Sequence, residues 1–430
     1  MYIRAQQGLT SETPAMWASS SARIAAAAPE SARGRIILFA NLGHALDHYV
    51  MLIYPTTILA LEKAFPEVSY GKLLQLSLGA FVLIGLGSLP SGWLGDKWSR
   101  RGMMIIFFFG AGLACLATAA TQSFTALAVG LGAIGLIASI YHPVGAPMMV
   151  ASASPERLGR VIGLNGVFGN LAIASAPFIT GAITDLFGWR LAFILPGIAA
   201  LGIGTAFVMT VPDAAERSTR KSSHAREYSR FTVVRVFGIL FFCTFAAGLI
   251  FNVASVTFPK LFEERLPDIV HSATAAGAVT TAVTIVGALA QLTVGRAMDR
   301  FSLGTVFLVT SGLQMVGLFF LANAFGLAAP SAAMVAMLGQ FGQVTVNEAM
   351  TAKYAPDRLR GRIYAVRYFL NFAVAAFAVT MAAKMHDATG GFTGTYRILS
   401  ICGALIFAGA LIFPRRDVVP AARAAVQAAE

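Results

Sequence analysis

The segment Gly92-Trp-Leu-Gly-Asp96-Lys-Trp-Ser-Arg100-Arg101-Gly102 decides the fold, because its pattern returns later in the chain as Gly295-Arg-Ala-Met-Asp299-Arg300-Phe-Ser-Leu-Gly304. The two aspartates lie 203 positions apart. Each copy is a short turn that carries one acid and several bases, and it separates two apolar runs long enough to cross a membrane. A polar turn that recurs in this setting predicts a duplicated membrane protein.

The composition indicates the same class. Hydrophobic residues make up 57% of the chain and charged residues 12%, which is half of the roughly 25% found in ordinary soluble domains. The mean hydropathy is +0.71. The net charge of +12 does not indicate a nucleic-acid partner, because the bases lie at the ends of apolar runs and form no continuous stripe. The expected surroundings are therefore a lipid bilayer.

Apolar runs of about 20 residues, enough to cross about 30 Å of hydrocarbon, recur along the chain between turn or charge signals. They predict twelve membrane helices, at 36–60, 72–93, 103–121, 124–149, 161–184, 190–211, 234–259, 272–295, 303–323, 330–352, 362–384 and 395–413.

The distribution of bases predicts the orientation. With the N-terminus in the cytoplasm, 24 of the 32 Lys and Arg residues fall on the cytoplasmic side, as the positive-inside rule requires. We therefore expect a multi-pass protein of a bacterial-type inner membrane with both termini in the cytoplasm. The first residues contain no apolar stretch of the kind a signal peptide needs. The predicted organisation is a cytoplasmic tail (1–33), a six-helix bundle (34–211), a cytoplasmic linker (212–233), a second six-helix bundle (234–415) and a second tail (416–430).

Further matches relate the two halves. Pro155-Glu-Arg157-Leu-Gly-Arg160 resembles Pro356-Asp-Arg358-Leu-Arg-Gly-Arg362, and Tyr54-Pro55 resembles Phe258-Pro259, at offsets of 201 to 204. Over residues 34–415 the chain resembles the major facilitator superfamily of transporters. The resemblance implies an all-α membrane protein with twelve helices in two six-helix pseudo-repeats around a central cavity, working by alternating access and expected to be a monomer. It also implies gating roles for residues of the paired loops, namely Gly92, Asp96, Arg100, Arg101, Gly295, Asp299 and Arg300.

Ionisable side chains inside membrane spans cost about 3 kcal/mol or more, so they usually face a cavity or a partner. The set predicted to face the cavity or to couple transport to protons is His44, Asp47, His48, His142, Glu348 and Arg367. Neutral polar residues in the spans are candidate substrate contacts, namely Asn252, Gln340, Gln343, Asn347 and Asn371.

The first span holds the densest group of these residues. His44, Asp47 and His48 are spaced i, i+3 and i+4, so all three side chains share one helix face. A carboxylate beside imidazoles can exchange protons near neutral pH, which favours proton coupling over a static polar patch between helices. A metal site is the rival interpretation, because His-x-x-x-His is ligand spacing. Intramembrane zinc proteases, however, place an acid directly after the first histidine, where this chain has Ala45.

The fourth and fifth spans contain further motifs that can be compared with transporter families. In the fourth span Pro143 follows His142 and permits a kink that exposes backbone to a cavity. Together with the His-x-x-Asp pattern of the first span, this His-Pro pair resembles the fosmidomycin-resistance and drug-efflux branch of the superfamily. The arginine that many drug antiporters carry in the fourth span is missing here, and Asn170 stands where their glycine-rich motif has proline.

Glu348 and Arg367 are predicted to lie on adjacent helices. They are expected either to form an ion pair that changes as the cavity opens, or to form a static pair. Arg367 is alternatively a contact for an anionic substrate.

The sequence therefore predicts a secondary transporter that moves a small molecule, coupled to protons, with efflux by antiport favoured. No ATP-binding loop, cofactor motif or catalytic set is found, so an enzyme is not expected; Gly130-Leu-Gly132-Ala-Ile-Gly135 lies within a span and indicates helix packing. The alternatives are an uptake symporter or uniporter for a small organic anion, a metal-ion transporter, and a sensor of the same fold that transports nothing.

Overall fold

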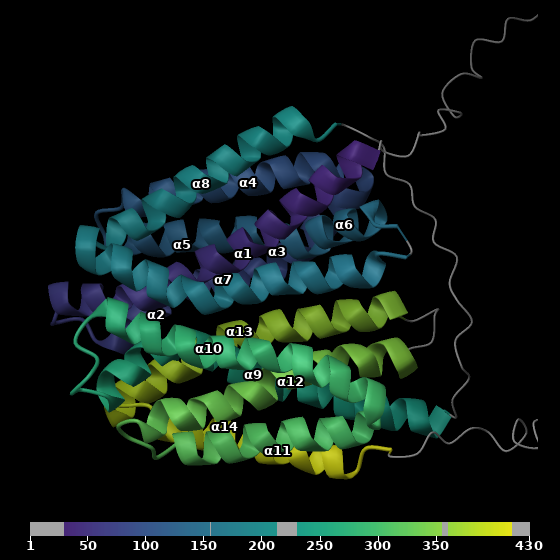
Figure 1. Ribbon diagram of the computed structural model, residues 1–430. Helices are drawn as coiled ribbons and strands as arrows, with labels where there is room; N and C mark the ends of the chain where they lie inside the picture. The colour runs from purple at the N-terminus through teal and green to yellow at the C-terminus, as the bar shows by residue number, and fades with distance from the viewer. Residues whose placement is uncertain (1–29, 155, 213–229, 355–359, 415–430) are drawn as a thin grey trace, which may run out of the picture.

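The computed structural model describes residues 30–154, 156–212, 230–354 and 360–414. Within these ranges the chain forms helices that run roughly parallel and no strands (Figure 1). Most of the predicted N-terminal tail and linker, and all of the predicted C-terminal tail, lie outside the described residues. The all-helical membrane fold predicted from the sequence is confirmed.

The first half of the chain contributes α1 (Glu30–Ala64), α2 (Tyr70–Gln75), α3 (Leu78–Lys97), α4 (Arg100–Ala119), α5 (Phe124–Ala138), the π-helical turn η1 (Tyr141–Gly145), α6 (Ala146–Ser152), α7 (Leu158–Phe187) and α8 (Trp189–Thr210). Two spans are thus built from several pieces, because α2 and α3 form one long helix and α5, η1 and α6 form another.

The second half contributes α9 (Arg230–Arg265), α10 (Ala273–Arg300), α11 (Leu303–Leu321), α12 (Ala328–Tyr354), α13 (Arg360–Thr389) and α14 (Thr393–Leu411). Among the described residues, ten helices are long and apolar enough to cross a membrane. With α12 and α13, which have 27 and 30 residues, the described residues contain twelve helical segments long enough to cross a membrane, in agreement with the prediction.

The helix boundaries follow from capping residues. Ser99, Ser123 and Ser272 each accept a hydrogen bond from the backbone N–H three residues ahead, at the start of α4, α5 and α10. Gly188 ends α7 with a φ of 87° and Gly390 follows α13 with a φ of 68°, a left-handed conformation that glycine adopts without strain. Large apolar side chains such as Leu89 remain exposed on the outside of the bundle, as expected for a surface in contact with lipid.

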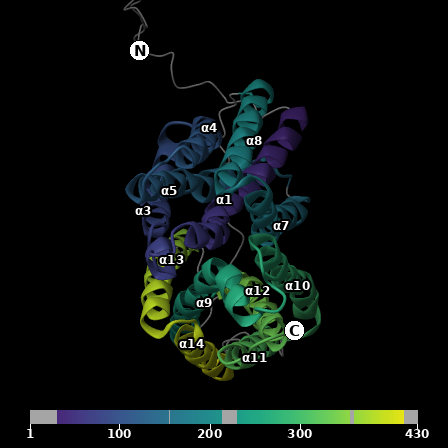
Figure 2. The same ribbon diagram turned by 90° about the vertical axis from the view of Figure 1, so that its left-hand side faces the viewer.

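The two ends of the bundle differ. We call the end that carries Asp96 and Asp299 the basic end, and the other the opposite end. Figure 2 views the helices from the opposite end, where α7 of the first half lies beside α10 of the second. At this end a Cβ atom on Gly181 would lie 2.6 Å from the carbonyl carbon of Ala273, so the two backbones touch.

Toward the basic end the same two helices are less crowded. A Cβ atom on Gly163 or Gly166 of α7, or on Gly295 of α10, would meet nothing within 4 Å. The two halves of the protein are therefore in close contact at the opposite end, and their helices α7 and α10 diverge toward the basic end.

Candidate functional site

The polar residues of α1 lie in the interior of the first half, against η1 and α7. Asp47 is 1% exposed, and its Oδ2 atom lies 3.3 Å from Nε2 of His142. The ring centroid of His44 lies 4.8 Å from the ring centroid of His48 and 5.4 Å from that of His142. The structure thus brings together the four titratable residues that the sequence placed in the first half.

Local backbone geometry positions His142. Pro143 has no N–H group and cannot continue the α-helical hydrogen-bond ladder. The helix accommodates it through the π-helical turn η1, a feature often found at functional sites. The kink expected at this proline is therefore a widened helical turn. From this turn the side chain of His142 points toward Asp47.

Hydrogen bonds from neighbouring polar groups hold the cluster in place. Nδ1 of His44 donates to the backbone carbonyl of Asn165 at 2.8 Å. The side chain of Asn165 in turn donates to Asn41 Oδ1 at 3.0 Å and to the hydroxyl of Tyr141 at 2.9 Å, and the Tyr141 ring stacks on His44 at 5.1 Å. Sequence reasoning missed Asn41 and Asn165, although each is a polar residue inside a predicted span.

These contacts fix the hydrogen-bonding roles of the two α1 histidines. Since Nδ1 of His44 carries the proton donated to Asn165, Nε2 of a neutral His44 is an acceptor. Nε2 of His48 lies 3.1 Å from it and must then be the donor. The bond between His142 and Asp47 is different, because either group can hold the proton that they share.

The geometry also bears on the metal alternative. One ring nitrogen from each of His44, His48 and His142 lies within 4.8 Å of the others, and three imidazoles are a known ligand set for Zn²⁺. The ring nitrogens of His44 and His48 are, however, hydrogen-bonded to each other. A metal ion would have to replace that bond, so the arrangement favours proton exchange over metal binding.

Asp47 has one oxygen with no hydrogen-bond partner among the described residues, namely Oδ1. A buried, ionised carboxylate in that position is costly, because nothing replaces the water it has lost. A protonated Asp47 carries a smaller cost. The site is thus suited to binding a proton and releasing it when water gains access.

A cavity with about 310 Å³ of empty space lies between the two halves. Leu52 of α1 lines this cavity and lies one turn from His48, whereas the four residues of the cluster do not line it. The other lining residues are mostly apolar, with three hydroxyl groups among them: Ile173, Pro177, Phe251, Ala254, Ser255, Phe258, Thr280, Thr284, Met337 and Phe341. None of these side chains is charged.

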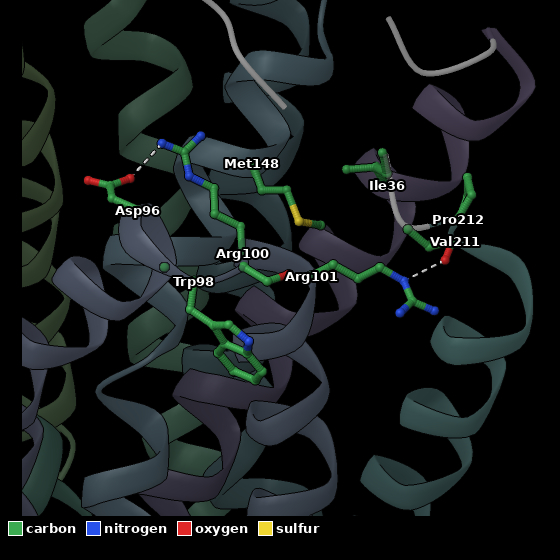
Figure 3. A pocket seen from close by; sticks show the side chains of 10 residues that line it. Ile36, Asp96, Trp98, Arg100, Arg101, Met148, Val211 and Pro212 are labelled. Atoms are coloured by element: carbon green, nitrogen blue, oxygen red, sulfur yellow. Dashed lines mark hydrogen bonds and ion pairs between the residues drawn. The ribbon is translucent and has the colours of Figure 1, made fainter. Parts of the chain in front are cut away.

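A second, more polar pocket lies at the basic end and holds about 630 Å³ of empty space, part of it open to solvent (Figure 3). Asp96 and Arg100 line it and form an ion pair of 2.9 Å. Arg101 points away from that pair, and its guanidinium donates to the carbonyl groups of Val211 and Val208 at the end of α8. The predicted gating residue Asp96 thus pairs within its own loop in this state, while Arg101 joins α4 to α8.

Of the remaining predicted residues, Gly92 lies on α3, where a Cβ atom would be 3.2 Å from Pro143, and the others lie in the second half, away from the cluster. Asp299 and Arg300 are exposed at the end of α10, and Glu348 is exposed on α12. Asn252 donates to Gly248 within its own helix. The side chains of Arg367 and Asn371 lie outside the described residues, so the predicted ion pair with Glu348 stays a prediction.

Three amide side chains of α12 occupy the interior of the second half. Gln340 donates to the carbonyl of Ala247 at 3.1 Å and accepts from Gln314. Gln343 and Asn347 are 1% and 6% exposed, and both have amide atoms without a partner among the described residues. None of the three lines the cavity between the halves, and their role as substrate contacts stays a prediction.

Comparison with known proteins agrees with this architecture. The family model of the Major Facilitator Superfamily matches residues 38–266 and 240–429. The chain therefore belongs to this superfamily of membrane transporters. The fold is similar to that of a D-xylose-proton symporter, with a TM-score of 0.72, 16% identity, and coverage of 90% of this chain and 99% of that one. A bacterial homolog of the human lysosomal transporter Spinster gives a TM-score of 0.68 at 14% identity, over 90% and 98% of the two chains.

Curated relatives match more locally. The chain is 26% identical to the 4-hydroxybenzoate transporter PcaK of Pseudomonas aeruginosa over 51% of this chain and 56% of that protein. It is 24% identical to the chloramphenicol efflux pump Rv0191 of Mycobacterium tuberculosis over 60% of this chain and 61% of that protein. The chain thus spans less than two thirds of the length of these relatives, one named as a transporter of 4-hydroxybenzoate and the other as an efflux pump.

Proposed function

We propose that this protein is a secondary active transporter that exports a small molecule across the inner membrane in exchange for protons. The observation that carries the proposal is the environment of the buried Asp47 carboxylate. Its Oδ2 atom pairs with Nε2 of His142, and its Oδ1 atom has no hydrogen-bond partner among the described residues. Asp47 lies on α1 five residues before Leu52, which lines the cavity between the halves, and so a proton and a substrate can influence each other there.

The proposed cycle uses His142 as the proton relay to Asp47. A proton that enters from one side reaches Asp47 through His142, while His44 and His48 hold the ring positions through their mutual hydrogen bond. A protonated, neutral Asp47 is stable in the state in which the interior is closed to water, whereas an ionised Asp47 is more stable in the state in which water reaches it. Proton binding therefore biases the equilibrium between the two states of the transporter, as coupled exchange requires.

The cavity lining favours a class of substrate. Phe251, Phe258 and Phe341 offer aromatic surfaces, and Ser255, Thr280 and Thr284 offer hydroxyl groups. Because none of the lining side chains is charged, the lining favours a neutral, largely apolar or aromatic molecule over an organic anion. Uptake of an organic anion is the second candidate, since one relative is named as a 4-hydroxybenzoate transporter and Arg367 lies on α13.

The loops at the basic end are proposed to gate the cavity from the cytoplasm. Asp96 forms an ion pair with Arg100 in the present state. When the basic end closes, Asp96 would leave this ion pair and contact residues of the other half. Asp299 and Arg300 occupy the equivalent loop of the second half. The bundles at 34–211 and 234–415 would then move relative to each other about the cavity, as a monomer and without a cofactor or an enzymatic step.

The test is transport by purified protein in liposomes, with chloramphenicol and 4-hydroxybenzoate as probes. We expect a pH gradient to drive uphill movement of a transported probe in the parent, and Asp47→Asn to abolish this movement while it leaves probe exchange intact. Asp268→Asn, which changes an exposed acid in the loop after α9, is the matched control. Unchanged pH-driven transport in Asp47→Asn contradicts the proposal, and loss of both activities assigns Asp47 to substrate binding or folding.

The two probes also separate the candidate functions. Exchange of chloramphenicol alone supports the apolar substrate class, and exchange of 4-hydroxybenzoate alone supports the organic anion. Transport that Zn²⁺ drives or requires would favour the metal alternative.

A further inference from the structure

Two aspartates occupy matching positions at the opposite end of the bundle. Asp185 lies near the end of α7 and Asp387 near the end of α13, 202 positions later. Each is followed after three residues by a glycine with positive φ, Gly188 and Gly390. The internal duplication thus extends to these helix ends, which the sequence comparison did not include.

Each aspartate binds the start of a helix in the other half. Oδ1 of Asp387 accepts from the N–H of Gly71 at 2.9 Å, and Oδ2 accepts from the Ser69 hydroxyl at 2.9 Å. The contact joins α13 to the start of the α2–α3 helix. The carboxylate of Asp387 therefore accepts from a backbone N–H at the helix start that has no partner within the helix.

Asp185 makes the corresponding contact at the start of α10. Its Oδ1 accepts from the N–H of Ala273 at 3.2 Å, and its Oδ2 accepts from the N–H and the hydroxyl of Thr274 at 2.7 and 2.5 Å. A carboxylate is stabilised at this position by charge-assisted hydrogen bonds and by the positive end of the helix dipole.

The packing below the two carboxylates is also related by the duplication. Gly71 lies against the backbone of Ala383, and Gly181 lies against the backbone of Ala273. Gly71 and Ala273 are 202 positions apart, as are Gly181 and Ala383. The duplication therefore relates the two contacts, with glycine and alanine exchanged between the halves. Any Cβ atom on either glycine would overlap the facing helix, so each aspartate reaches its partner only while the halves are in close contact.

We propose that Asp185 and Asp387 form a matched pair of acidic latches that hold the opposite end of the transporter closed. Both latches must release when the two halves separate at that end, because every contact described for them crosses between halves. The ion pair between Glu62 of α1 and Lys260 of α9, at 2.7 Å, lies at the same end and adds a third connection. The proposal goes beyond the proposed function, since it depends on neither the substrate nor the coupling ion.

The test measures distances between spin labels in the absence of substrate. In a background without Cys115, Cys243 and Cys402, one labelled pair replaces Glu67 and Ile269, exposed on loops of the two halves at the opposite end. A second pair replaces Arg160 of α7 and Arg296 of α10, both exposed toward the basic end. The first pair reports opening at the latches and the second reports closure at the basic end.

We expect Asp185→Asn and Asp387→Asn each to raise the ratio of open to closed molecules at the opposite end by roughly three- to tenfold, with a larger rise in the double variant. The distance between the second pair should shorten in the same molecules. Asp268→Asn is the matched control, since Asp268 lies in a loop at the same end and takes part in neither latch, and it should leave both distributions unchanged.

Milder variants cover the case in which the asparagine variants do not accumulate. Ser69→Ala and Thr274→Val each remove one hydroxyl donor from a latch and keep the carboxylate, and they should shift the distances in the same direction by a smaller amount. Folded latch variants with the parental distributions overturn the proposal, as does an equal shift in Asp268→Asn. Because no transport is measured, a failure of the proposed proton exchange would not alter the result.

Discussion

At the scale of the residue, Asn165 shows why a buried polar cluster needs more than its titratable members. Its side-chain amide connects Asn41 of α1 to Tyr141 of η1, and its carbonyl accepts from His44. One residue of α7 thus determines where two other segments of the first half lie. An asparagine that is 7% exposed in an apolar interior is stable there because these bonds are made.

We predict that Asn165→Ala lowers the stability of the protein by about 1–3 kcal/mol, because Asn41 Oδ1 loses its described donor inside the bundle. Thermal unfolding in detergent measures the change. Asn252→Ala is the control, since Asn252 donates to Gly248 within its own helix, and its loss should cost less. Equal stability of Asn165→Ala and the parent would show that water replaces the missing amide.

The sequence predicted His44, Asp47, His48 and His142 because ionisable groups are rare and costly inside apolar spans. It could not predict the pairing of His142 with Asp47 in place of either α1 histidine. That choice depends on the rotation that the π-helical turn gives to α5 and α6 around Pro143, and on the distance between α1 and η1. Spacing along one helix shows which side chains share a face, whereas contacts between helices depend on packing.

At the scale of the element, the glycines of α7 have different roles although they recur at similar spacing. A Cβ atom on Gly169 would lie 2.5 Å from Cε1 of His44, whereas one on Gly166 would meet nothing within 4 Å. Gly169 therefore lets α7 approach α1 at the histidine cluster, the proposed site of proton exchange. Gly166 belongs to the part of α7 that diverges from α10.

We predict that Gly169→Ala displaces the His44 ring and lowers pH-driven transport at least tenfold, since a shift of about 1 Å can disturb a positioned reaction strongly. Gly166→Ala is the matched control. It should retain transport and be as stable as the parent or slightly more stable, because alanine favours helix over glycine by about 1 kcal/mol. Proteoliposome uptake and thermal unfolding measure the two effects. Parental uptake in Gly169→Ala would show that the His44 ring moves without loss of function.

At the scale of the whole molecule, repetition in the sequence predicted the fold. The loop between α3 and α4 and the loop between α10 and α11 lie at the same end of the bundle, as two copies of one unit must. The state of the transporter was not predictable, because the halves of one sequence take up at least two relative positions with similar free energy. Contacts such as Asp185 with Thr274 exist in one of these positions, and local sequence patterns do not select between them.

The proposed orientation of the molecule rests on charge. Of the 32 Lys and Arg residues, 24 belong to the loops predicted to be cytoplasmic or to the tails and the linker, and such an excess remains on the cytoplasmic side during insertion. We predict that a single cysteine replacing Ser222 of the 212–233 linker, in a background without the three native cysteines, reacts with a membrane-impermeant maleimide only after cell lysis. A cysteine at Glu67, in the loop between α1 and α2, should react in intact cells and serves as the control. The reverse pattern would place the basic end outside, and the two acidic latches would then close the cytoplasmic side of the transporter.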